Sequence, residues 1–184
     1  MAQVAIITAS DSGIGKECAL LLAQQGFDIG ITWHSDEEGA KDTAREVVSH
    51  GVRAEIVQLD LGNLPEGAQA LEKLIQRLGR IDVLVNNAGI FRYDHVVNLS
   101  VGVVRTMLML HVNTVVLLCR YFGEDMRRRG KGYILNMSSM SAWFSYPDIS
   151  LYASTKCFLK SFSRAFRLEM LDYGVNVTTV CPGA

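Results

Sequence analysis

The chain has 184 residues, of which 49% are hydrophobic and 20% are charged, and its formal net charge is −1. These proportions are typical of one folded domain and exclude disordered, collagen-like and coiled-coil chains. The balanced charge gives no basis for binding nucleic acid or an acidic membrane surface. Because we find neither a secretion signal at the start nor an apolar run of bilayer length, we expect a cytoplasmic protein that does not enter a membrane.

Cysteines and histidines give no sign of a metal site. The four cysteines contain no Cys-x-x-Cys pair, and the histidines at positions 34, 50, 95 and 111 lack the spacing of metal ligands. We therefore expect reduced thiols and no metal.

Apolar residues alternate along the chain between two patterns. Short runs rich in β-branched residues predict strands at residues 4–8, 27–33, 53–59, 81–85, 133–138 and 175–180. Stripes at helical spacing predict helices between them, the first three ending near Gly26, Gly51 and Gly79. Two longer helices are expected at about residues 100–129 and 151–173.

This alternation predicts an α/β fold of the doubly wound, Rossmann type, with six parallel strands covered by helices on both faces. The absence of any linker or repeat predicts one domain over residues 1–184. In such folds ligands bind at the carboxyl ends of the strands, where the strand order reverses.

A glycine-containing loop joins the first strand to the first helix. Residues 8–15 read Thr-Ala-Ser-Asp-Ser-Gly-Ile-Gly. Glycines let the backbone approach a pyrophosphate, and the start of a helix offers free N–H groups to it. The alternative is a simple tight turn, but the position after a first strand favours dinucleotide binding. The loop residues expected to contact a cofactor are Ser10, Ser12, Gly13, Ile14 and Gly15.

The loop resembles the Thr-Gly-x-x-x-Gly-x-Gly segment of the short-chain dehydrogenase/reductase family, with Ala9 in place of the first glycine. If this position needs a positive φ, alanine costs about 1 kcal/mol there. The sequence Asn-Asn-Ala-Gly at residues 86–89 resembles a second family segment, and the resemblance implies that Asn87, Ala88 and Gly89 line the cofactor groove.

Two further cofactor contacts follow from the resemblance. Asp60 and Leu61 come after the third strand, where family members place an aspartate beside the adenine; the alternative for Asp60 is a carboxylate that caps a turn. Pro182 and Gly183, after the sixth strand, are also assigned to the cofactor.

Tyr152 and Lys156 form a Tyr-x-x-x-Lys pair, and spacing i, i+4 places both side chains on one helix face. Together with Ser139 and Asn113 they resemble the family's Asn-Ser-Tyr-Lys tetrad. Taken alone, each match is common: a solvated helical pair, a hydroxyl at a strand end, and an asparagine packed in a helix. Their order along the chain, each on the expected kind of element, favours the tetrad.

The resemblance implies hydride transfer between a nicotinamide and a carbonyl or alcohol carbon, with tyrosine moving the proton. A free tyrosine has a pKa of about 10, and an ammonium about 4 Å away favours the phenolate by on the order of 4 kcal/mol at an effective dielectric of 20. In the family, lysine also binds the nicotinamide ribose and, like tyrosine, lies against the cofactor. Serine polarises the substrate oxygen, and asparagine holds a water that links the lysine to solvent.

The end of the second strand bears on the choice of dinucleotide. NAD-preferring members carry an aspartate there, which pairs with the ribose hydroxyls. This chain has Trp33 instead, followed by His34 and Ser35, and the next carboxylate is Asp36. The sequence therefore favours NADP over NAD, with Trp33 near the adenosine and His34 donating to the 2′-phosphate.

The resemblance implies a small carbonyl or secondary alcohol substrate and a homodimer or homotetramer. Family members run to about 250 residues, with a seventh strand after the sixth, so we expect that this chain is truncated. Residues before Asn86 resemble diacetyl/acetoin-reductase-like members, and residues after Gly89 resemble hydroxysteroid-dehydrogenase-like members, which leaves a fusion open. Two other functions stay open: a dinucleotide-binding module without catalysis, and a methyltransferase, which gives no reason for the tyrosine–lysine pair.

Overall fold

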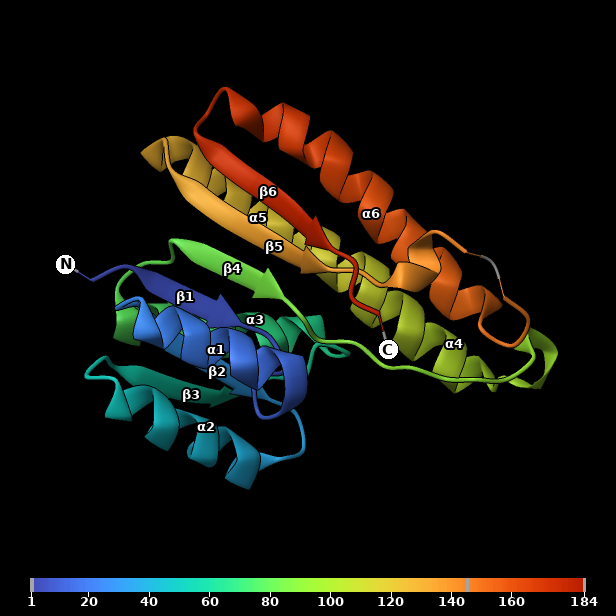
Figure 1. Cartoon of the computed structure of the whole chain (residues 1–184), viewed down its shortest axis with the longest axis horizontal. Helices are drawn as coiled ribbons and strands as arrows, with labels where there is room; N and C mark the ends of the chain where they lie inside the picture. The colour runs from blue at the N-terminus through green and yellow to red at the C-terminus, as the bar shows by residue number, and fades with distance from the viewer. Residues whose placement is uncertain (1, 145, 184) are drawn as a thin grey trace. The chain divides into compact units, whose positions relative to one another are not determined.

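The computed structural model describes residues 2–144 and 146–183 of the chain, in two compact units, Met1–Ala88 and Gly89–Ala184. In both units parallel strands alternate with helices (Figure 1). All six predicted strands are present, and the predicted α/β fold of Rossmann type is confirmed.

The first unit contains four parallel strands in the order β3-β2-β1-β4. Their bounds are β1 Val4–Ile7, β2 Asp28–Trp33, β3 Ala54–Gln58 and β4 Val83–Asn86. Every residue of β1 and β4 is buried, as the unbroken apolar runs predict for strands covered on both faces. From β1 the chain moves outward to β2 and β3, and then returns to place β4 on the other side of β1. A doubly wound sheet binds its ligands at this change of direction, beyond the carboxyl ends of the strands.

The helices of this unit are α1 Gly13–Gln24, α2 Glu37–Ser49 and α3 Leu64–Leu78. Figure 1 shows α1 in front of the strands and α3 behind them, so both faces are covered. The predicted stop signals are confirmed, because Gly26, Gly51 and Gly79 follow the helices with φ of 85°, 81° and 92°. These values lie in a region that favours glycine, which explains why the helices end there.

The second unit contains two parallel strands, β5 Gly132–Met137 and β6 Val175–Val180, and the helices α4 Val101–Leu108, α5 Thr114–Arg129 and α6 Ser150–Leu171. Helices α5 and α6 lie side by side, since a Cβ on Gly123 would meet the Phe166 ring at 3.0 Å. The buried amide of Asn136 in β5 donates a 2.8 Å hydrogen bond to Ser163 in α6. This bond fixes α6 against the strand.

The predicted helix over residues 100–129 is interrupted. Residues Met109–Asn113 form a π turn, in which the N–H of Thr114 donates to the carbonyl oxygen of Met109, five residues earlier. A π turn adds one residue to the helix and is frequent at functional sites. Within it His111 is buried, whereas Asn113 is exposed.

The same helical stretch, Val101–Arg129, is long and apolar enough to cross a membrane by length and composition, with a mean hydropathy of 1.7 and 28% of its apolar window buried. No such segment was predicted from the sequence. A single helix of this kind is weak support for a membrane span, because core helices of soluble proteins reach the same length and apolar composition.

Candidate active site

The glycine loop has two residues with positive φ, one before α1 and one at the first position of α1. Ala9 has φ 52° and Gly13 has φ 53°. Ala9 therefore occupies the backbone region in which alanine is strained. At Gly15 a Cβ would lie 2.1 Å from the carbonyl oxygen of Ala9, so only glycine fits.

The start of α1 is open to a ligand. Ser12 precedes the helix, and its side chain makes no capping hydrogen bond. Ser12, Gly13 and Ile14 are all exposed, and no atom lies within 4 Å of the position of a Cβ on Gly13. Uncapped N–H groups at a helix start attract anions, so this loop fits a dinucleotide pyrophosphate.

Asn87 and Thr8 hold this loop in shape. The Asn87 amide donates to the carbonyl oxygens of Thr8 and Ala9 at 3.1 and 2.9 Å. The Thr8 hydroxyl oxygen accepts from the backbone N–H groups of Asn87 and Ala88, both at 2.9 Å. Asn87 and Ala88 thus support the loop from the end of β4.

Ser10, which the sequence predicts as a cofactor contact, is held by hydrogen bonds inside the first unit. It is fully buried; its hydroxyl donates to the Ile7 carbonyl oxygen at 2.9 Å and accepts from the Thr32 N–H at 3.1 Å. The hydroxyl therefore ties the loop to β2, and its bonds lie within the protein and point to no ligand.

Trp33 ends β2, as predicted, and is half-buried. His34 is exposed, and its carbonyl oxygen accepts a 3.0 Å bond from the side chain of Gln58. Asp60 is exposed and accepts from the Gly62 N–H at 2.8 Å, which is the turn-capping role that the sequence left open for it. Leu61 is buried.

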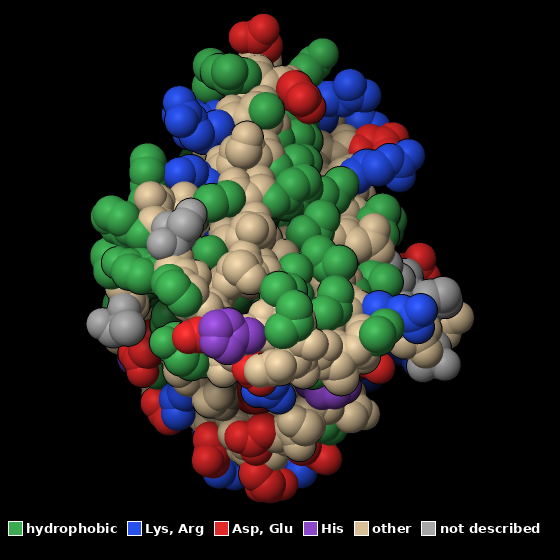
Figure 2. All heavy atoms as spheres, turned by 90° about the vertical axis from the view of Figure 1, so that its right-hand side faces the viewer, with side chains coloured by type: hydrophobic (Ala, Val, Ile, Leu, Met, Phe, Trp, Pro, Cys, Tyr) green, Lys and Arg blue, Asp and Glu red, His purple; other side chains and the backbone are tan. Residues whose placement is uncertain are grey.

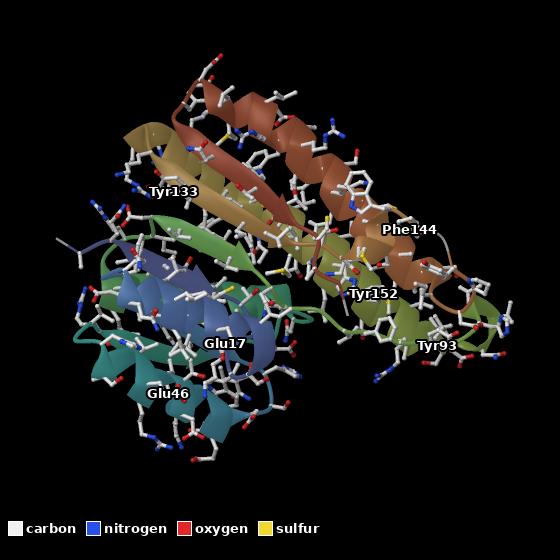
Figure 3. The ribbon with its side chains drawn as sticks, viewed as in Figure 1. Glu17, Glu46, Tyr93, Tyr133, Phe144 and Tyr152 are labelled. Atoms are coloured by element: carbon white, nitrogen blue, oxygen red, sulfur yellow. The ribbon has the colours of Figure 1, made fainter. Side chains whose placement is uncertain are left out.

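In the second unit, Tyr152 of α6 is labelled in Figure 3. Lys156 shares its helix face, and the Lys156 Nζ lies 5.6 Å from the centroid of the Tyr152 ring. Lys156 is 5% exposed and donates to the Met137 carbonyl oxygen at 2.9 Å. Burial lowers the pKa of Lys156 to about 8, against a smaller opposing effect of Cys181. The Phe91 ring meets the Tyr152 ring edge-on at 4.9 Å.

Two neighbouring serines at the end of β5 differ in accessibility. The buried Ser138 hydroxyl donates to the Lys156 carbonyl oxygen at 2.9 Å and so joins β5 to α6. Ser139 is half-buried, and its hydroxyl oxygen accepts from the N–H and the hydroxyl of Ser141 at 3.2 and 2.9 Å. Its own proton stays available for a substrate oxygen.

Asn113 lies in the π turn, where its exposed side chain donates to the Met109 sulfur at 3.0 Å. His111, two residues earlier, lies beside Tyr152, with the two ring centroids 5.7 Å apart. Burial, together with the positive charge of Lys156, lowers the pKa of His111 to about 3. His111 was not among the predicted site residues, although a histidine in an apolar helix was a signal.

The segment after β6 packs beside the serines. The Pro182 carbonyl oxygen accepts from the Met140 N–H at 2.9 Å, and a Cβ on Gly183 would lie 3.8 Å from the Met140 methyl group. Among residues 2–144 and 146–183, no three His, Cys, Asp or Glu side chains gather as a metal site would require.

Comparison with known proteins places this geometry in a family. "Uncharacterized oxidoreductase YohF" of Escherichia coli K12 is 60% identical over 185 residues, covering 100% of this chain and 73% of that protein. The crystal structure of acetoin dehydrogenase YohF from Salmonella typhimurium is 48% identical, with a TM-score of 0.94 and coverage of 100% and 73%. A short-chain dehydrogenase from Sphingobium yanoikuyae, solved with NADPH, is 27% identical, with a TM-score of 0.92 and coverage of 99% and 71%.

The pattern that describes the family "short chain dehydrogenase" matches residues 3–184. A glycine loop open at α1 and a tyrosine beside a buried lysine on α6 are the parts that the resemblance required. The chain therefore belongs to the short-chain dehydrogenase family, as an oxidoreductase that transfers hydride between a nicotinamide cofactor and a carbonyl or alcohol carbon.

Proposed function

We propose that this chain interconverts a small hydroxyketone and the corresponding diketone, such as acetoin and diacetyl, with NADP(H) preferred over NAD(H). The observation that carries the reaction is the buried Lys156 ammonium 5.6 Å from the Tyr152 ring. The substrate class is supported by the acetoin dehydrogenase that is 48% identical over the whole chain.

Each catalytic residue has a separate task in this proposal. Tyr152 gives its hydroxyl proton to the substrate oxygen in reduction and takes it back in oxidation. Lys156 stabilises the phenolate that remains, because its ammonium lies in a buried, weakly screened position. Ser139 donates a hydrogen bond to the substrate carbonyl oxygen. The nicotinamide, when bound, supplies the hydride.

The cofactor contacts are proposed unit by unit. In the first unit the pyrophosphate binds at the open start of α1, to Ser12, Gly13, Ile14 and Gly15. Asn87 and Ala88 support this loop through their hydrogen bonds to Thr8 and Ala9. In the second unit Lys156 binds the nicotinamide ribose, while Gly89, Pro182 and Gly183 provide backbone surface.

The NADP preference rests on Trp33 at the end of β2. No carboxylate stands at this position to repel a 2′-phosphate, and the exposed His34 follows it. A solved relative with NADPH bound, 27% identical to this chain, supports the same choice.

The decisive experiment is turnover. Purified protein is mixed with NADPH or NADH and a panel of diacetyl, a monoketone and a ketosteroid, and absorbance is followed at the nicotinamide band. We expect diacetyl to be reduced fastest, and Tyr152→Phe to abolish turnover while Tyr133→Phe, an exposed tyrosine on β5, leaves it unchanged. Turnover that survives in Tyr152→Phe would exclude this mechanism; binding of NADPH without any turnover would favour a dinucleotide-binding module.

We also propose that two copies associate through α5 and α6. Figure 2 shows hydrophobic side chains over much of the face that it displays. The large apolar residues that α5 and α6 expose are Leu117, Tyr121, Phe158, Leu168 and Leu171. Association would cover this surface, since a patch of this kind on a monomer is a liability. Light scattering coupled to gel filtration tests it, with Leu117→Asp as the disrupting variant.

We further propose that the chain forms one catalytic domain and that it works in the cytoplasm.

A further inference from the structure

His111 makes two hydrogen bonds whose directions fix its tautomer. Its Nε2 lies 3.0 Å from the backbone nitrogen of Ile90, and its Nδ1 lies 2.8 Å from the Thr155 hydroxyl oxygen. A backbone N–H can only donate, so Nε2 accepts and the ring proton is on Nδ1, which donates to Thr155. The Thr155 hydroxyl in turn donates to the Tyr152 carbonyl oxygen at 2.7 Å.

Gly89 shows how closely these groups meet. A Cβ on Gly89 would lie 2.8 Å from the His111 Nε2 and 3.7 Å from the Lys156 Nζ. An imidazolium here would lose the bond from Ile90 and place a second positive charge beside Lys156. Burial of His111 and the charge of Lys156 lower its pKa to about 3, so the ring is neutral at any working pH.

We propose that His111, as the neutral Nδ1–H imidazole, is a positioning residue that joins the Gly89–Ile90 backbone to the helix carrying Tyr152 and Lys156. Both ring nitrogens are occupied, so His111 carries no proton to the substrate; it acts through Thr155 and the backbone of Tyr152. The inference rests on the proposed roles of Tyr152 and Lys156.

Two substitutions separate hydrogen bonding from packing. In His111→Gln the amide oxygen accepts from Ile90 and the amide nitrogen donates to Thr155. His111→Leu fills the space but leaves the Ile90 N–H without this acceptor and the Thr155 hydroxyl oxygen without this donor. We expect His111→Leu to lower kcat at least about tenfold with KM for NADPH changed less than about threefold. His111→Gln stays within about threefold of the wild type, with the same pH profile of kcat.

Thr155→Val tests the next bond in the chain. It removes the acceptor of the His111 proton and the donor to Tyr152 with little change in volume. Because both substitutions break the same path, the double variant Thr155→Val/His111→Leu loses no more activity than the worse single variant. Losses that multiply instead would show two independent effects and overturn the proposal.

Three comparisons complete the test. His50→Gln, at an exposed histidine that ends α2, keeps wild-type activity. Asn113→Ala costs less activity than His111→Leu; the reverse order would overturn the proposal. The readout independent of activity is ¹⁵N NMR of the histidine rings without cofactor, which should show the proton on Nδ1 and no charging between about pH 5 and about pH 9.

A proton on Nε2, titration near the ordinary histidine pKa, or a His111→Gln variant as slow as His111→Leu would each overturn the inference. If His111→Leu does not fold, Thr155→Val, His111→Gln and the NMR spectrum still decide. The proposed catalytic roles fail separately: an active Tyr152→Phe would refute them while leaving the NMR result unchanged.

Discussion

The Lys156 ammonium donates a 2.9 Å hydrogen bond to the carbonyl oxygen of Met137, the last residue of β5, in a site that is 5% exposed to solvent. One carbonyl does not replace the hydration of an ammonium, and burial therefore lowers the pKa of Lys156 from 10.5 to about 8. The catalytic cation is thus held at a cost to the stability of the fold.

This cost has a definite pH dependence. Between about pH 8 and pH 10.5 the unfolded chain keeps a proton on Lys156 that the folded chain has lost, so the free energy of unfolding rises with pH. The cost is about 3 kcal/mol below pH 8, and it is relieved as the pH rises to 10.5. Urea denaturation of the wild type and Lys156→Met at several pH values measures it, because other titrations cancel in the difference.

We expect the stability of the wild type to rise relative to Lys156→Met as the pH passes from about 8 to 10.5. Lys131→Met, at an exposed lysine, serves as the control and should follow the wild type. A constant difference between wild type and Lys156→Met across this window would show that burial does not perturb Lys156.

The positive φ of Ala9 predicts that replacing this alanine by glycine stabilises the fold. Its φ of 52° is one that glycine adopts without strain, and Ala9→Gly should raise the free energy of unfolding by about 0.5–1 kcal/mol after the entropy of the glycine is counted. Ala44→Gly, inside α2, should lower it by about 1 kcal/mol. Thermal unfolding of the three proteins checks this, and an Ala9→Gly protein less stable than wild type would contradict it.

At Gly15, by contrast, a substitution is expected to lower both stability and cofactor affinity. An added Cβ would press on the Ala9 carbonyl oxygen and on the Asn87 amide, at 2.1 and 2.6 Å, so the loop must move. Gly15→Ala should cost about 1–3 kcal/mol of stability and lower NADPH affinity at least about tenfold, measured by calorimetry. Gly26→Ala, where φ is 85° and nothing is within 4 Å, should cost stability alone. Equal NADPH binding by Gly15→Ala would place the cofactor elsewhere.

Most of the fold could be predicted because local sequence patterns indicate where strands and helices lie. Buried parallel strands appear as unbroken apolar runs, and three helices stop at glycines whose positive φ the structure confirms. The strained conformation of Ala9 was also expected from the glycine that the family has there. These features depend on residues close together in the chain.

His111 shows what a search by motif leaves out. The family motif led to Asn113 and gave no reason to select His111, although the buried stripe of Val115, Leu118 and Phe122 continues to His111 at helical spacing. The periodicity thus contained the signal. The π turn and the bonds from Ile90 and Thr155 depend on tertiary packing, which the sequence does not display.

Trp33 provides the test of cofactor choice. It is the last residue of β2, the position at which an aspartate would meet the adenosine ribose. In Trp33→Asp a carboxylate about 5 Å from a 2′-phosphate would cost about 3 kcal/mol at an effective dielectric of 20, reduced by screening to about 1–2 kcal/mol. The ratio of the NADPH and NADH dissociation constants should therefore shift toward NADH by about ten- to thirtyfold.

Trp33→Asn, which removes the indole without adding charge, should shift the ratio by less than about threefold, because its neutral amide does not repel the phosphate. If Trp33→Asp leaves the ratio unchanged, the end of β2 does not face the ribose, and the proposed preference for NADP loses its basis.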